Sequence, residues 1–157
     1  GAAMNDSEAS SATRSRHHRW SPLAATVGLY GAVMAGGILG SLLRWLVALA
    51  IPIVEGGLPW ATLLINVSGC LFIGFYAALT GPDGRLFVGP RMRQFVMTGI
   101  CGGYTTFSSF SLETMRLALS GHEGLAALYV VLSLAGWLAA VWLGDALAGR
   151  LNILKGE

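Results

Sequence analysis

The chain has 157 residues, enough for one compact domain, and a formal net charge of only +2. Hydrophobic residues make up 54% and charged residues 11%. Soluble domains carry about 25% charged residues, so this chain has too few charges to cover a water-facing surface. The composition indicates a membrane protein, and the scattered basic residues form no stripe that would favour nucleic-acid binding.

Residues 1–22 are polar, rich in Ser and Ala, and include three arginines and the pair His17 and His18. A metal site at the histidine pair is less consistent with this composition than a solvated basic tail beside a membrane helix. We therefore expect a disordered N-terminal tail at 1–22, a membrane domain at 23–150 and a short C-terminal tail at 151–157.

Four apolar stretches follow the tail, and each reaches the roughly 20 helical residues that cross a bilayer. They lie at residues 23–51, 60–80, 95–119 and 125–148. The connections between them are short and contain Pro and Gly, which end helices. The sequence therefore predicts an all-α membrane protein with four transmembrane helices, consecutive helices being antiparallel neighbours.

An even number of crossings puts both termini on one side of the membrane. That side and the second connection hold eight of the ten Lys and Arg residues, and only Arg44 and Arg116 lie on the other side. Without the three arginines of the tail the ratio is 5 to 2, which favours cytoplasmic termini. Four helices enclose too little space for a pore, so we expect a homodimer or larger assembly.

Polar and small residues in the first two stretches have two interpretations each. Gly36 and Gly40 form a GxxxG pattern that lets another helix approach closely. Arg44 either snorkels to the interface or anchors a helix and attracts anions at a vestibule. Asn66 either holds helices together or offers its amide donors to an anion.

The third stretch is unusual because Gly102–Gly103 is followed by five hydroxyl residues within residues 105–111. The two glycines lower helix propensity by about 2 kcal/mol relative to alanine. This pattern predicts an interruption near the middle of the helix, where freed carbonyls could bind a hard cation. The alternative is an intact, slightly bent helix whose hydroxyls bond back to carbonyls one turn earlier.

Aromatic and hydroxyl side chains recur at helical spacing near the predicted break. Phe107 and Phe110 are spaced i, i+3 and would share a face, with the positive edges of their rings available to a small anion. Tyr129 and Ser133 are one turn apart and could present hydroxyls to the same groove. Trp137 is interpreted as a packing or lipid anchor.

The chain shows no arrangement typical of a metal site or an enzyme. Cys70 and Cys101 have neither a CxxC partner nor a histidine at ligand spacing, so they are interpreted as small buried side chains. The predicted helices contain no Ser–His or His–carboxylate set, and His122 lies in a connection. We therefore do not expect an enzyme.

The run Gly-Gly-Tyr-Thr-Thr-Phe-Ser-Ser-Phe-Ser at 102–111 resembles the third-helix signature of the bacterial fluoride channels, the Fluc or CrcB family. Two other segments agree in order: 36–40 followed by Arg44, and Asn66-Val67-Ser68-Gly69. The resemblance covers about residues 36–149, nearly the whole hydrophobic region.

This resemblance implies an antiparallel, dual-topology homodimer in the cell inner membrane with two fluoride pathways. A sodium ion at the dimer centre would be held by backbone carbonyls, by motif position those of Gly102 and Thr105. Phe107 and Phe110 match the family's fluoride-lining rings, and Asn66 matches its pore amide. The other polar residues of the pathway would be Thr106, Ser109, Tyr129 and Ser133.

Two features depart from the family pattern. Many members place another hydroxyl one turn after Ser133, where Trp137 stands here. Dual insertion also calls for a weak charge bias, whereas the ratio here is 5 to 2. This chain could instead have a fixed orientation and pair with an oppositely oriented partner.

The favoured function is a passive, fluoride-selective channel that exports fluoride from the cytoplasm and reduces its toxicity. The alternative is a small proton-coupled exporter of the multidrug type, which needs a deeply buried carboxylate that titrates. The sole candidates are Glu113 and Asp145, and both lie nearer helix ends. A purely structural membrane subunit would not explain the polar cluster of the third helix.

Overall fold

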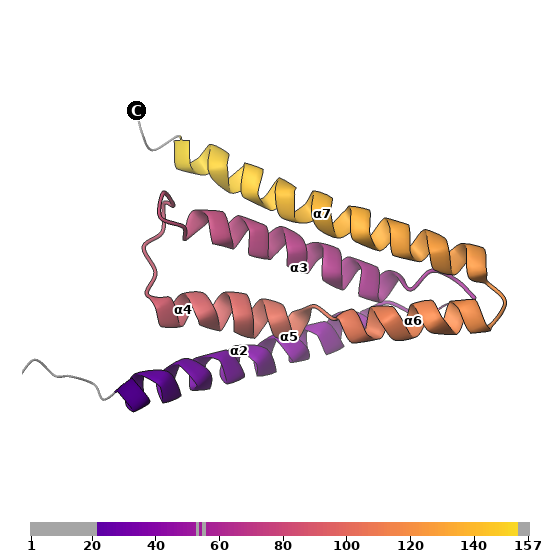
Figure 1. The fold of residues 1–157 in the computed structure, drawn as a ribbon, viewed down its shortest axis with the longest axis horizontal. Coiled ribbons are helices and arrows are strands. Elements are labelled where there is room, and N and C mark those ends of the chain that lie inside the picture. The colour runs from indigo at the N-terminus through magenta and orange to yellow at the C-terminus, as the bar shows by residue number, and fades with distance from the viewer. Residues whose placement is uncertain (1–21, 53, 55, 154–157) are drawn as a thin grey trace, which may run out of the picture.

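The computed structural model describes residues 22–52, 54 and 56–153, and all of its regular elements are helices. Most of the expected N-terminal tail lies outside the described residues. Three helices are continuous: α2 (Pro22–Ala50), α3 (Trp60–Leu79) and α7 (Glu123–Ile153). The third predicted crossing is divided into α4 (Pro90–Gln94), the π-helix η1 (Phe95–Cys101), α5 (Gly102–Tyr104) and α6 (Phe107–Leu119) (Figure 1).

Two helices extend beyond their predicted bounds. The third crossing begins at Pro90 and not at residue 95, because proline has no N–H to leave unpaired at the start of a helix and its φ suits that position. The last helix was expected to end at residue 148 but continues to Ile153. Asn152 ties this final turn to the end of α3, since its amide donates to the carbonyl of Ala78 and accepts from the N–H of Arg85.

Among the described residues, three helices are long and apolar enough to cross a membrane: Leu23–Ala50, Trp60–Leu79 and Glu123–Asn152. The interrupted crossing runs alongside them from one end of the bundle to the other (Figure 1). Large apolar side chains are exposed along the outer faces of the helices. Such extensive exposed apolar surface suits a lipid environment. The protein is therefore a multi-pass membrane protein.

The helices associate in two pairs that are not sequential neighbours. The α3 helix packs most extensively along α7, and α2 along η1 and α5. Consecutive helices are in contact and antiparallel, as predicted, but their contacts are less extensive (Figure 1). Within each pair the helices run in the same direction (Figure 1). Close approach explains this pairing, because a methyl group at Gly36 would overlap the carbonyl oxygen of Phe95 and one at Gly40 that of Ile100.

The two ends of the bundle differ in charge. The start of α2, the α3–α4 connection and the end of α7 lie at one end, and the α2–α3 and α6–α7 connections lie at the other (Figure 1). The described arginines at the first end are Arg85, Arg91, Arg93 and Arg150. These arginines therefore lie together at one end of the bundle, as predicted, and Arg116 lies near the opposite end.

Candidate functional site

The third crossing is interrupted at two extended residues. Thr105 has φ −75° and ψ 159°, and Thr106 has φ −149° and ψ 124°, between the helical residues Tyr104 and Phe107. The prediction of a broken helix is confirmed, and the alternative of an intact, bent helix is wrong. Thr106 then caps α6, because its hydroxyl oxygen accepts the backbone N–H of Ser109 at 3.1 Å.

The break removes the helical donors of the carbonyl groups between residues 102 and 105, including those of Gly102 and Thr105. In an uninterrupted helix the N–H of Thr106 would bond to Gly102, and that of Ser109 would bond to Thr105. Both amides are engaged elsewhere: Thr106 donates to Asn66 and Ser109 donates to the capping hydroxyl of Thr106. The carbonyls of Gly102 and Thr105 therefore lack their helical donors, and oxygen ligands of this kind suit a hard cation.

Asn66, buried on α3, pairs with the extended backbone of Thr106 at two points. Its Nδ2 donates to the Thr106 carbonyl at 2.8 Å, and its Oδ1 accepts the Thr106 N–H at 2.8 Å. The amide thus supplies the partners that a neighbouring backbone strand would supply. Of the two predicted roles for Asn66, that of holding helices together is confirmed, while its second Nδ2 proton remains available to another acceptor.

Four aromatic rings gather where α6 meets α7. The centroids of Phe107 and Phe110 are 5.5 Å apart, and those of Phe110 and Tyr129 are 5.2 Å apart. Trp137 lies 5.0 Å from Phe110 and 6.5 Å from Phe107, in both cases with one ring edge toward the other ring. The prediction that Phe107 and Phe110 share a face is confirmed, and the contacts of Tyr129 and Trp137 with these rings are further features.

A carboxylate joins three helices on the α6 side of the aromatic group. Glu113 accepts the hydroxyl of Thr62 from α3 at 2.7 Å and the hydroxyl of Tyr129 from α7 at 2.8 Å. Each of its oxygens therefore has a donor. Because a hydroxyl has one proton, Tyr129 cannot donate to a passing anion while it donates to Glu113.

Sequence reasoning did not include Thr62 and Glu113 among the site residues. A spacing signal was present, since Thr62 lies one turn before Asn66 and Glu113 lies three residues after Phe110 on the same helix. Thr62 was overlooked because a lone threonine in an apolar helix usually bonds to its own backbone. Its real partner, Glu113, is 51 residues away in sequence.

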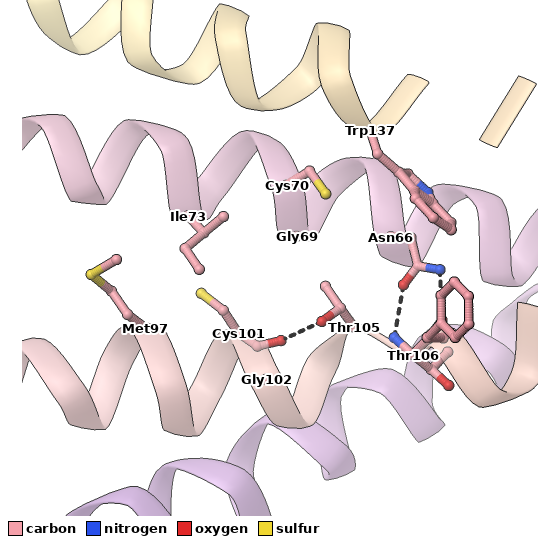
Figure 2. Close-up of a pocket in the computed structure, with 11 residues that line it drawn as sticks. Asn66, Gly69, Cys70, Ile73, Met97, Cys101, Gly102, Thr105, Thr106 and Trp137 are labelled. Carbon is pink, nitrogen blue, oxygen red and sulfur yellow. Dashed lines mark hydrogen bonds between the residues drawn. The ribbon is translucent and has the colours of Figure 1, made fainter. Parts of the chain in front are cut away.

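A cavity of about 310 Å³ lies between α3, α7 and the interrupted crossing beside the break. Figure 2 shows Trp137 reaching from α7 toward Asn66, with Thr105 and Thr106 opposite. Phe107 also lines this cavity and is 69% exposed, and Gly102 is exposed. One chain therefore leaves this side of the cavity uncovered.

The structure brings most of the predicted pathway residues to this region. Thr106, Ser109, Phe107 and Phe110 lie at the start of α6, and the Thr106 hydroxyl donates to that of Ser109 at 3.1 Å. Ser133 is fully buried on α7, and its hydroxyl has no hydrogen-bond partner among the described residues. Arg44 is half-buried near the end of α2, outside the residues that line the cavity.

The chain is similar to known proteins over most of its length. Residues 31–145 match the family described as "CrcB-like protein, Camphor Resistance (CrcB)". A protein named "Fluoride-specific ion channel FluC 1" from Rhodopseudomonas palustris (strain BisB18) is 55% identical over 129 residues, covering 82% of this chain and 92% of that protein.

Two other relatives have similar coverage. "Fluoride-specific ion channel FluC 1" from Bradyrhizobium diazoefficiens is 57% identical over 127 residues, or 81% of this chain and 89% of that protein. "Fluoride-specific ion channel FluC" from Rhodospirillum rubrum is 53% identical over 124 residues, or 78% of this chain and 96% of that protein. Since the family match spans most of the chain and includes the broken helix, Asn66 and the aromatic group, this protein belongs to the CrcB family.

Proposed function

We propose that this chain forms a passive, fluoride-selective channel that lets fluoride leave the cytoplasm and so reduces its toxicity. The observation that carries the proposal is its 53–57% identity to three proteins named as fluoride-specific ion channels, over 89–96% of their lengths. The hydrogen-bond donors and ring edges beside the broken helix support the same function, because they can replace the hydrogen bonds that water donates to an anion.

The pathway replaces the hydration shell of the ion with protein donors. The second Nδ2 proton of Asn66 and the hydroxyls of Ser109 and Ser133 have no acceptor among the hydrogen bonds of the described residues. Phe107 and Phe110 add ring edges, which carry partial positive charge. Narrow spacing between these groups favours fluoride over chloride, because the larger ion would force the rings apart.

The functional unit in this proposal is a homodimer of oppositely oriented chains. Phe107 is 69% exposed although it lies beside the break, and Gly102 is exposed as well. A second copy would cover this open side of the cavity. Pairing of two inverted copies would also bring the carbonyls of Gly102 and Thr105 from both chains to one centre.

The freed carbonyls of Gly102 and Thr105 fit a sodium ion, because both are hard oxygen ligands without their helical donors. Two such carbonyls from each chain would give a coordination number suited to a small cation. A sodium ion there would lower the electrostatic energy of an anion in the surrounding low dielectric. In this proposal Gly102 and Thr105 hold the ion through their backbone carbonyl oxygens alone.

The proposed location is the cell inner membrane. The basic end of the bundle favours the cytoplasmic side in a chain of fixed orientation. Orientation can be measured with single cysteines in a chain lacking Cys70 and Cys101, introduced by Asp83→Cys at one end and Glu123→Cys at the other. Equal partial labelling of both by an impermeant maleimide on intact cells supports dual topology, and labelling of one alone indicates a fixed orientation.

Fluoride efflux from liposomes tests the function. Vesicles that contain the purified protein are loaded with potassium fluoride or chloride, and valinomycin is added to release the balancing potassium. Fast fluoride release with chloride retained is expected. Release that depends on an imposed pH gradient would favour the proton-coupled exporter, and no release above empty vesicles from a folded dimer would contradict the channel.

A further inference from the structure

Trp137 carries a buried polar atom that the fold does not use. Its indole nitrogen has no hydrogen-bond partner among the described residues, and neither has the hydroxyl of Ser133 one turn earlier on α7. Buried polar groups are nearly always paired, and an unpaired one destabilises a protein. An indole N–H only donates, so the partner it lacks is an acceptor.

The position of Trp137 shows which acceptor could reach it. The residue lines the same cavity as Asn66, Thr106 and Phe107, beside the break in the third crossing. Figure 2 shows its side chain directed from α7 toward Asn66. Asn66 also has an unused amide proton beside this cavity, so α3 and α7 each carry an N–H here that has no acceptor among the described residues.

The rings around Trp137 restrict the size of such an acceptor. Phe110 lies 5.0 Å from it and Phe107 lies 6.5 Å from it, centroid to centroid. Phe110 is buried and held by Tyr129, whereas Phe107 is 69% exposed and packed on one side only. Of the two phenylalanines, Phe107 can therefore move with the smaller loss of packing.

We propose that the indole N–H of Trp137 is a fluoride-binding donor that continues the line of polar groups from Tyr129 and Ser133 along α7. This proposal rests on the proposed channel function and adds a residue to its pathway. The indole N–H binds an anion through its proton, and its nitrogen does not coordinate a cation. A group held between two rings also admits a compact anion more readily than a larger halide.

The competing arrangement is an N–H directed at the face of a phenylalanine ring. Such contacts are weak, but they are real and would explain a buried indole without any ion. The two arrangements make different predictions. A fluoride donor must respond to fluoride and must matter for flux, whereas a ring contact would affect packing alone.

Flux measurements use Trp137→Phe, which removes the N–H and keeps an aromatic ring. Because a hydrogen bond to a charged group is a strong one, fluoride efflux is expected to fall by about tenfold or more. Trp137→His keeps a ring N–H and should recover part of that loss. The matched control is Trp142→Phe, on the same helix but 69% exposed, which should leave efflux within about twofold.

Nuclear magnetic resonance of protein labelled with ¹⁵N-indole tryptophan tests binding directly. The chain has five tryptophans, and Trp137→Phe identifies the signal of residue 137 by its loss. Sodium fluoride should move the Trp137 indole proton downfield in a saturable way, while sodium chloride and the Trp142 signal serve as controls. This readout does not require conduction.

The outcomes separate the two proposals. A saturable Trp137 shift supports the donor even if the liposomes release no fluoride, in which case the channel proposal fails and a binding site remains. An unmoved Trp137 signal in protein that conducts fluoride, with Trp137→Phe conducting equally well, overturns the donor and leaves the channel intact. A shift equal in fluoride and chloride would overturn the selectivity for a compact anion.

Discussion

Replacing Asn66 with alanine tests how the broken helix is stabilised. The substitution leaves the backbone N–H and the carbonyl of Thr106 without their hydrogen-bond partners. Thr106 is only 8% exposed, so water cannot readily replace them. Each unpaired buried group destabilises a protein by about 1–3 kcal/mol, so the free energy of unfolding should fall by about 2–6 kcal/mol. The lower part of this range is expected in a lipid or detergent environment, where the unfolded chain also finds partners.

Asn152 provides a matched control within the same chain. Its amide also makes two backbone contacts, accepting from Arg85 N–H at 3.1 Å and donating to Ala78 carbonyl at 3.2 Å. It lies at the end of α7, where water can replace the lost partners. Asn152→Ala should therefore lower the free energy of unfolding by less than about 1 kcal/mol.

Denaturant unfolding in micelles, followed by tryptophan fluorescence, measures both variants, and fluoride efflux is recorded in parallel. Equal destabilisation by Asn66→Ala and Asn152→Ala would refute the reasoning, because burial is the only difference invoked. Loss of efflux from Asn66→Ala at unchanged stability would show that the amide acts on the ion alone. Asn66→Asp keeps an acceptor for Thr106 N–H but turns an oxygen toward its carbonyl, so it should lower both stability and efflux.

Three further substitutions test separate parts of the structure. Phe107→Ile should reduce fluoride efflux at least about tenfold with little loss of stability, since this ring is 69% exposed; Phe87→Ile, 93% exposed in the α3–α4 connection, is the control for efflux. Tyr129→Phe leaves one oxygen of Glu113 without its donor, so the free energy of unfolding should fall by about 1–3 kcal/mol in a denaturant titration. Tyr30 is 66% exposed, and Tyr30→Phe should change the free energy of unfolding by less than about 0.5 kcal/mol. Gly40→Ala places a methyl group against the carbonyl of Ile100 and should lower the melting temperature. Gly31 has open space around it, so Gly31→Ala should leave the melting temperature unchanged or raise it. Equal melting temperatures for these two variants would contradict close packing of α2 on η1.

Local signals were sufficient to predict the helices and the break. Apolar stretches of membrane length and the Pro- and Gly-containing connections located all four crossings within a few residues. The Gly102–Gly103 pair and the hydroxyls after it predicted the interruption, because their helix propensity and their local bonding both oppose a regular helix. The same pattern does not specify which residues become extended, since that depends on Asn66, 40 residues earlier in the chain.

Contacts between distant segments were not predictable in the same way. The pairing of α3 with α7 depends on close approach at glycines of both helices: a methyl group at Gly74 would overlap Val141, and one at Gly144 would overlap Leu71. Short connections suggested sequential neighbours, and nothing in a single sequence ranks one glycine-bearing face above another. Glu113 was considered as a titrating carboxylate, but its hydroxyl partners lie on two other helices and carry no sequence signal of their own.

The hydrogen bonds of the site divide its polar groups into two classes, and this division determines which groups can serve an ion. The hydroxyl protons of Thr62 and Tyr129 are bound to Glu113, and that of Thr106 is shared with neighbouring serines. These groups maintain the junction of α3, α6 and α7. Unused donors remain on Asn66, Ser109, Ser133 and Trp137. Substitution of a group whose donor is bound within the protein should therefore mainly reduce stability. Substitution of a group with an unused donor should mainly alter fluoride flux and selectivity. Asn66 is the exception because it belongs to both classes, so its variants should lose stability and flux together.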